Sequence, residues 1–207
     1  MNIVFDFGAV LFDWRPAERV RQRLQPWAVT AEQADGLAKA IFAHDDWQAF
    51  DRGLLALEQV VDRTASRLGL PQERVHGLMA PIGEELQPIA SNVAVLHGLA
   101  ERRDRQADLR LFFLSNMPAP FARTLEQRHD FLKVFDGGLF SADVQLGKPD
   151  PAIYQCLARQ YALLPQRTWF IDDHRANVDA ACALGWQGLH LAEPEALASL
   201  LAAALTS

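Results

Sequence analysis

The sequence predicts an α/β fold, in which a doubly wound Rossmann-like parallel sheet carries an inserted all-helical cap domain. Short continuous apolar runs are typical of strands buried on both faces of a parallel sheet. Segments with helical spacing lie between these runs, and this alternation is typical of doubly wound proteins. Only the first run is followed by a long segment without a strand, which indicates an insertion. The apolar runs are residues 2–5, 111–114, 169–171 and 188–191.

The segment after the first strand, residues 15–85, contains no convincing strand and consists of several predicted helices. Thr30 and Gln33 have the spacing of a capping box, which predicts a helix start at this point. We therefore predict a cap domain over residues 15–85 and a sheet domain made of residues 1–14 and 86–207. The breaks between the cap helices fall at Pro26, Gly53 and the turn Gly69–Leu70–Pro71.

Helices are also predicted between and after the later strands. Residues 149–161 start with a proline and keep apolar side chains at helical spacing. Residues 176–184 end before Gly185, a residue favoured just after a helix. The apolar run of residues 196–205 is too short to span a bilayer and predicts a surface helix. These helices complete the alternation of a doubly wound fold.

The composition narrows the class of protein. Of the 207 residues, 50% are hydrophobic and 22% are charged, which excludes a globally disordered chain and predicts one domain, or one domain with an insertion. The formal net charge is −6, so we expect neither nucleic acid nor a membrane surface as a partner. Cys156 and Cys182 are isolated and no basic leader precedes the first strand, so we expect a cytoplasmic protein. The oligomeric state is not predicted.

Polar side chains stand where the predicted strands end. In an open parallel sheet, ligands bind at the carboxyl ends of the strands, so these side chains are expected to converge on one edge. Taken singly, the first aspartate, the serine–asparagine pair and the lysine are each more often a turn, capping or solvent-facing residue, whereas two adjacent aspartates after an apolar run are as often functional as structural. Together they provide carboxylates, a hydroxyl, an amide and an ammonium group. Three predicted strands are followed by Asp6, by Ser115 and Asn116, and by Asp172 and Asp173, whereas Lys148 precedes a predicted helix and can reach the same edge.

This set of groups is suited to phosphoryl transfer. The transferred group carries spread negative charge, so catalysis depends mainly on positioning and charge neutralisation. A carboxylate can act as the nucleophile and form an aspartyl-phosphate. Clustered carboxylates repel one another unless a cation lies between them, and Mg²⁺, which prefers oxygen ligands, is the natural candidate. A lysine adds a compact positive charge. The predicted partner is therefore a small-molecule phosphate ester.

Four segments extend this set into longer motifs: Val4–Trp14, Phe112–Asn116, Gly147–Tyr154 and Phe170–Asn177. In order and over nearly the whole chain, they resemble the motifs of the haloacid dehalogenase-like hydrolase superfamily, and the fold prediction rests on this resemblance more than on periodicity. The helical insertion resembles that family's C1-type cap. Trp47–Gly53 is similar to a recurrent stretch in phosphatases of the α-D-glucose-1-phosphate phosphatase type. The resemblance implies a Mg²⁺-dependent phosphatase of a small phosphorylated metabolite, with a sugar phosphate favoured.

The resemblance also implies a role for each matched residue. Asp6 is implied to be the nucleophile and a Mg²⁺ ligand, and the carbonyl of Gly8 a second ligand. Asp173 is implied to bind the ion directly and Asp172 to act nearby, with their order left open. Asn177 would orient the acidic pair or the waters of the metal. The residues implied to hold or neutralise the phosphoryl group are Ser115, Asn116 and Lys148.

The cap, together with the loop that leads into it, is expected to set specificity. Trp14 directly follows the first motif, and Trp47 lies within the predicted cap. An aromatic wall with Arg15 or Arg52 suits a polar sugar or a similar metabolite, so we predict that Trp14, Trp47 and Arg52 bind substrate. Packing in the core of the cap is the alternative role of Trp47.

One position departs from the family pattern. The usual phosphatase of the family has a second aspartate two residues after the nucleophile, as general acid, and here that position is Gly8. General acid–base help is worth ~10²–10⁴-fold. We expect Gly8 to mark a subgroup that uses another acid, and Asp13, His44 and a substrate-bound water are the candidates among which the sequence does not choose. Holding the loop between strand and cap is the alternative role of Asp13.

Two other functions are compatible with these motifs. A 2-haloacid dehalogenase uses the same carboxylate to displace halide from carbon without a metal, but Asp172 and Asp173 argue against it because unpaired carboxylates repel an anionic substrate. The other is a catalytically weak binding or regulatory protein that keeps the fold, and only Gly8 supports it. Chloride release without metal would favour the dehalogenase. Retained Mg²⁺ or phosphate binding without turnover would favour the binding protein.

Overall fold

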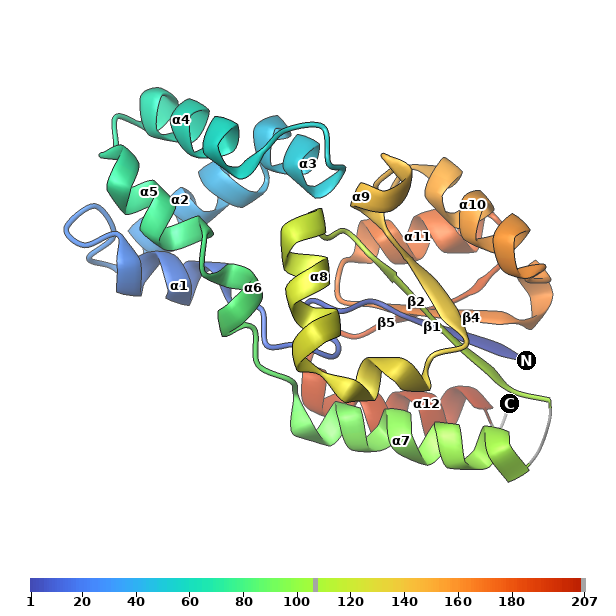
Figure 1. Ribbon diagram of the computed structural model, residues 1–207. Coiled ribbons are helices and arrows are strands. Elements are labelled where there is room, and N and C mark those ends of the chain that lie inside the picture. The colour runs from blue at the N-terminus through green and yellow to red at the C-terminus, as the bar shows by residue number, and fades with distance from the viewer. Residues whose placement is uncertain (106–107, 206–207) are drawn as a thin grey trace.

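The computed structural model describes residues 1–105 and 108–205, and the strands of this part of the chain form one parallel sheet of five, in the order β3-β2-β1-β4-β5 (Figure 1). The central strand, β1, pairs with β2 on one side and β4 on the other. The predicted doubly wound α/β class is confirmed. The strands are β1 (Asn2–Phe5), β2 (Arg110–Ser115), β3 (Gly137–Phe140), β4 (Thr168–Asp172) and β5 (Gln187–His190).

Both faces of the sheet are covered by helices. Ile3 and Phe5 of β1 belong to one hydrophobic cluster and Val4 between them belongs to another, because successive side chains of a strand point to opposite faces. Helices α7, α8 and α12 contribute to the first cluster, and α10 and α11 to the second. The bounds are α7 (Ala90–Arg105), α8 (Ala119–Arg128), α9 (Ser141–Val144), α10 (Pro151–Tyr161), α11 (Arg175–Ala183) and α12 (Leu197–Leu205), with 3₁₀ turns at Asp130–Val134, Pro165–Arg167 and Pro194–Ala196.

Among the strands of the described chain, β3 is the one that the sequence pattern missed. Its first two residues, Gly137 and Gly138, give no apolar signal. A Cβ at Gly137 would lie 2.4 Å from the Tyr161 ring, and a Cβ at Gly138 would lie 2.3 Å from the Phe113 ring. The strand therefore needs glycine for contacts that are distant in sequence, and a local pattern does not reveal them.

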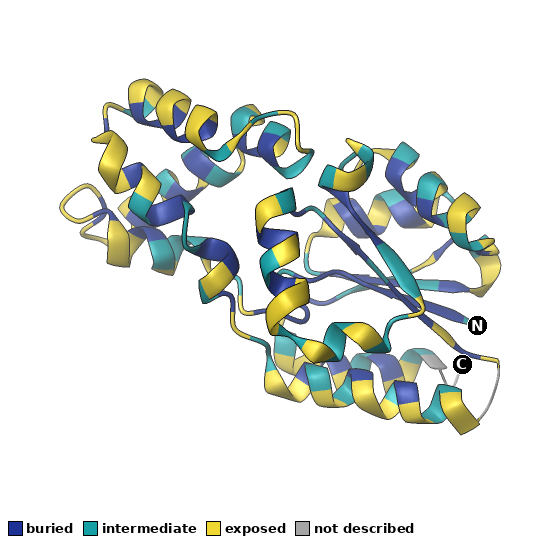
Figure 2. Cartoon of the chain, in the orientation of Figure 1, coloured by how far each residue is buried: buried dark blue, intermediate teal, exposed yellow. Residues whose placement is uncertain are grey.

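The long insertion after β1 is helical, as predicted, and lies beyond the carboxyl ends of the strands (Figure 1). Its outward helix faces are largely exposed, whereas the three central strands β1, β2 and β4 are mostly buried (Figure 2). The boundaries at residues 14 and 86 stay a prediction. The helices are α1 (Pro16–Arg23), α2 (Ala31–Phe42), α3 (Asp45–Asp51), α4 (Leu57–Leu68), α5 (Gln72–Met79) and α6 (Ile82–Glu85).

The predicted capping box at the start of α2 is confirmed. The Thr30 hydroxyl accepts a hydrogen bond from the Gln33 amide N–H at 3.2 Å, and the Gln33 side chain accepts one from the Thr30 amide at 3.0 Å. No helix in the described ranges has both the length and the apolar character needed to cross a membrane.

The two connections between sheet and insertion run side by side. The Asp13 amide donates to the Gln87 carbonyl and the Ile89 amide donates to the Leu11 carbonyl, both at 2.8 Å. The outgoing loop is itself closed by hydrogen bonds from the Phe12 and Leu11 amides to the Phe7 carbonyl. These bonds fix the loop that carries Gly8 and Trp14 next to the end of β1.

Candidate active site

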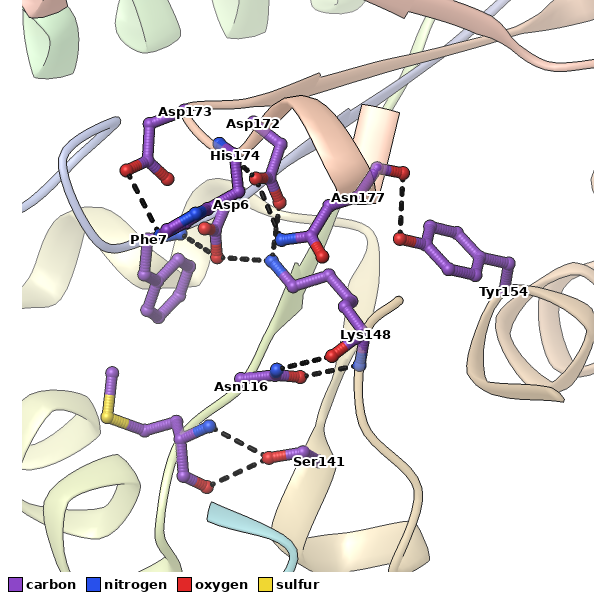
Figure 3. A network of polar contacts seen from close by, with 11 residues as sticks. Asp6, Phe7, Asn116, Ser141, Lys148, Tyr154, Asp172, Asp173, His174 and Asn177 are labelled. Carbon is purple, nitrogen blue, oxygen red and sulfur yellow. Dashed lines mark hydrogen bonds and ion pairs between the residues drawn. The ribbon is translucent and has the colours of Figure 1, made fainter. Parts of the chain in front are cut away.

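The ends of β1 and β4 bring three carboxylates together. Asp6 directly follows β1, and its amide donates to the Ile171 carbonyl of β4 at 2.9 Å. Asp172 ends β4 and Asp173 follows it. One carboxylate oxygen from each of Asp6, Asp172 and Asp173 lies within 4.8 Å of the others. The convergence expected from the strand order is therefore present (Figure 3).

Lys148 lies between two of these carboxylates. Its Nζ is 2.8 Å from Asp6 Oδ1 and 2.7 Å from Asp172 Oδ2, and its side chain is 1% exposed. Asn116 holds the lysine backbone from both sides, since the Lys148 amide donates to Asn116 Oδ1 at 2.8 Å and Asn116 Nδ2 donates to the Lys148 carbonyl at 2.9 Å (Figure 3). The Asn116 side chain thus positions Lys148. The role expected for it on the phosphoryl oxygens stays a prediction.

Asp172 and Asp173 differ in their surroundings. Asp172 is fully buried, and its Oδ1 accepts hydrogen bonds from the His174 amide at 2.8 Å and from Asn177 Nδ2 at 2.9 Å. Its Oδ2 accepts the bond from Lys148. Asp173 is only partly buried and faces a cavity that Asp6 also lines. Asp172 is therefore committed to protein contacts, whereas Asp173 presents its carboxylate to the cavity.

The electrostatics of this cluster suit a cation. Burial raises the pKa of Asp6 to about 7, because the Lys148 ammonium only partly offsets it and the neighbouring carboxylates add to it. Burial likewise raises the pKa of Asp173, with the Asp172 charge adding to the shift. Burial alone would lower the pKa of Lys148, but the charges of Asp172 and Asp6 outweigh it and raise the pKa. One ammonium faces three carboxylates, and an all-oxygen donor set fits a hard divalent cation such as Mg²⁺.

The cavity beside the cluster has a volume of about 360 Å³. Its polar end is formed by groups at the sheet edge, including Asp6, Gly8, Ser115 and Lys148. Most of its remaining wall is apolar and comes from both the insertion and the sheet domain. The larger apolar side chains of this wall are Phe12, Trp14, Phe42, Trp47, Ile82, Leu86, Met117 and Phe121.

The predicted substrate-binding residues differ in where they lie. Trp14 and Trp47 both line the cavity and are linked through Phe42, whose ring centre is 5.2 Å from that of Trp14 and 4.7 Å from that of Trp47. Arg52 does not line the cavity. It follows α3 and its stem packs on the loop before Lys148, where a Cβ at Gly147 would lie 3.4 Å from Arg52 Cγ. Binding of substrate by these three residues stays a prediction.

Two polar residues of the insertion, Gln48 and Asp51, line the cavity although neither was expected there from the sequence. Asp51 lies one helical turn after Trp47, so a shared face was readable from the spacing of the two residues. The signal was weak because α3 is only 7 residues long. Its approach to the sheet edge depends on how the insertion folds back.

Comparisons with known proteins point to one family. The sequence model of haloacid dehalogenase-like hydrolases matches residues 95–185. A sesquiterpene phosphatase of Aspergillus oryzae is 28% identical over 92% of this chain and 89% of its own length. A phosphoglycolate phosphatase of Salmonella typhimurium is 30% identical over 55% of this chain, which spans only 42% of that protein.

The fold has solved counterparts. A HAD family enzyme of Bacteroides thetaiotaomicron, solved with magnesium and inorganic phosphate, has a TM-score of 0.65 at 16% identity, over 91% of this chain and 92% of that one. The resemblance to the superfamily is thereby confirmed, whereas the α-D-glucose-1-phosphate phosphatase type stays a prediction. Residues 95–185 of this chain thus match the haloacid dehalogenase-like hydrolase family, and the chain shares its fold with a HAD family enzyme.

Proposed function

We propose that the protein is a Mg²⁺-dependent phosphatase that hydrolyses a small phosphorylated metabolite through an aspartyl-phosphate on Asp6. The observation that carries the proposal is the convergence of Asp6, Lys148 and Asp173 at one end of a cavity that is large enough for a small ester. The phosphatases among the relatives support the same reaction class.

Each residue at the sheet edge has its own role in the proposed reaction. Asp6 Oδ1 accepts hydrogen bonds from the Phe7 amide and from Lys148, which fix the carboxylate and leave Oδ2 to attack phosphorus. Lys148 offsets the charge of nucleophile and phosphate. Asp6 and Asp173, with the Gly8 carbonyl, would hold Mg²⁺, and Asp172 would hold Lys148 and the acidic pair in place. When bound, the ion supplies positive charge to the phosphoryl oxygens.

The apolar wall bears on the choice of substrate. The resemblance favours a sugar phosphate, yet the insertion offers few polar side chains to sugar hydroxyls, with Gln48 and Asp51 the ones that line the cavity among the described residues. An ester with an apolar alcohol fits the aromatic wall of Trp14, Phe42 and Trp47. The relative that acts as a sesquiterpene phosphatase supports this second candidate.

A substrate panel with and without Mg²⁺ tests the proposal. We expect hydrolysis of p-nitrophenyl phosphate and of at least one sugar or terpenoid monophosphate, abolished by EDTA and restored by Mg²⁺. Chloride release from 2-chloropropionate without metal would instead indicate a dehalogenase, which the acidic pair disfavours. Retained turnover in EDTA would contradict the assigned role of the carboxylate cluster.

A further inference from the structure

The reaction needs a proton that the usual position cannot supply. When the phosphorus–oxygen bond of an alkyl ester breaks, the leaving alkoxide must be protonated, and Gly8 has no side chain to do this. A Cβ at Gly8 would have Trp14 atoms as its nearest neighbours, at 3.6 to 3.7 Å. These distances are ordinary van der Waals contacts, and because Gly8 itself has no side chain, the proton donor has to come from elsewhere.

The two side chains considered from the sequence do not face the cavity. Asp13 accepts a hydrogen bond from Arg15 Nε at 2.8 Å in an exposed ion pair. His44 caps α3, where its Nδ1 accepts from the Asp46 amide at 3.1 Å. Neither residue contributes to the cavity wall. Because they do not line the cavity, both are excluded as direct donors.

The titratable side chains that do line the cavity fall into two groups. Asp6, Lys148, Asp173 and His174 belong to the sheet domain and surround the attacking side. Asp51, at the end of α3, is the titratable side chain that enters the cavity from the insertion, among the described residues. Because displacement at phosphorus is in line, the leaving oxygen points away from Asp6. It points toward the insertion.

We propose that Asp51 is the general acid of the reaction, a catalytic residue that protonates the leaving alcohol. The proposal rests on the proposed phosphatase function and deepens it. A carboxyl group of the insertion would then supply the proton that residue 8 cannot supply, because a glycine has no side chain.

The end of α3 is fixed against the sheet domain, as a proton donor requires. The Asp51 carbonyl accepts a hydrogen bond from the Ser141 hydroxyl, which is fully buried at the end of β3 and also accepts from the Met117 amide at 2.8 Å. Gly53 has a φ of +68°, and a Cβ there would lie 3.2 Å from the Ala142 carbonyl oxygen. The turn after α3 therefore packs closely on α9, and Asp51 is held at the cavity.

The surroundings of Asp51 keep its carboxyl in the form that can donate. The charged groups that act on it are Lys148, Asp6 and Arg52. Burial raises the pKa of Asp51 to about 8, since the two cations offset the burial only in part and the Asp6 carboxylate adds to it. At neutral pH the carboxyl is mostly protonated, and it loses its proton as the pH rises above this value.

The two half-reactions then balance. In the first, Asp6 Oδ2 forms a bond to phosphorus, the bond from phosphorus to the ester oxygen breaks, and the Asp51 proton goes to that oxygen, so a neutral alcohol leaves. In the second, the Asp51 carboxylate takes a proton from a water molecule, whose oxygen bonds to phosphorus while the bond to Asp6 breaks. Inorganic phosphate leaves and Asp51 is again protonated. The sum is one ester and one water converted to one alcohol and one phosphate.

Two esters with different leaving groups test this role in the Mg²⁺-loaded protein. In Asp51→Asn we expect kcat/KM for hexyl phosphate to fall by ~10²–10⁴-fold, the usual worth of general acid help. For p-nitrophenyl phosphate, whose phenolate leaves without a proton, we expect a change of only a few-fold, which also shows that the variant is folded. Asp45→Asn, an exposed carboxylate on the same helix, should leave both rates unchanged.

The outcomes separate the two proposals. Equal losses on both esters, or no loss on hexyl phosphate, would overturn the role of Asp51 and leave the phosphatase intact. A wild-type protein that hydrolyses neither ester would overturn both.

A spectroscopic readout needs no turnover. The infrared difference between wild type and Asp51→Asn at pH 7 should contain the band of a protonated carboxyl, and the band should lose half of its intensity near pH 8. A carboxylate at pH 7 would contradict the proposal.

Discussion

The Lys148→Met substitution tests how the buried charges are balanced. It removes the ammonium from a site where Nζ lies 2.8 Å from Asp6 and 2.7 Å from Asp172, with the lysine side chain 1% exposed. Methionine keeps the length of the stem, so packing changes little. The two carboxylates remain buried without their cation, and breaking a buried pair in this way costs about 3–5 kcal/mol. We expect a loss of that size in the free energy of unfolding at pH 7.

Urea unfolding of the metal-free protein measures this loss. The matched control is Lys133→Met, because Lys133 pairs with Asp130 at 2.5 Å on the surface, with side chains 74% and 89% exposed, and should contribute little. Mg²⁺ should restore part of the stability of Lys148→Met, since the ion binds the folded state and supplies positive charge to the same carboxylates. A loss no larger than that of the control would refute the assignment of Lys148 as the buried counter-ion.

Two further predictions concern the frame of the site. Ser141→Ala removes the hydroxyl that holds the Asp51 carbonyl, so it should cost about 1–3 kcal/mol in urea unfolding and lower turnover of hexyl phosphate more than that of p-nitrophenyl phosphate. Gly138→Ala would put a Cβ 2.3 Å from the Phe113 ring, so thermal unfolding should show a loss of about 1–3 kcal/mol. Gly77→Ala, in α5 with no atom within 4 Å of a new Cβ, should instead gain about 0.5–1 kcal/mol.

Most of the residues at the sheet edge could be predicted because they follow directly after apolar strand segments, a pattern that is visible in the local sequence. Three of the four strands that the pattern located are followed directly by a polar residue, and parallel strands bring their carboxyl ends to one edge of the sheet. Asp6 and Asp172 therefore meet as expected, although they are as far apart in the sequence as Asn2 and Thr168, which are 166 positions apart and share a hydrogen bond across the same two strands. The motif resemblance and the strand pattern gave the same answer independently.

Other features depend on how distant segments pack. Glycine is needed at two positions of β3 because the rings of Tyr161 and Phe113 leave no room for a Cβ there. The place of Asp51 at the cavity depends on the insertion folding back over the strand ends, and Arg52, its neighbour, lies against Gly147 instead of in the cavity. No local sequence pattern indicates which of two adjacent polar residues at the end of a short helix lies at the cavity.

The assignment of Asp6 as the nucleophile is tested most directly by trapping the aspartyl-phosphate. Wild-type protein mixed with a phosphate ester and Mg²⁺, then quenched in acid and digested, should yield an N-terminal peptide that carries one phosphoryl group on Asp6. Asp6→Asn should yield no such peptide and no turnover. An unmodified peptide from an actively turning-over wild type, or retained turnover in Asp6→Asn, would contradict the account.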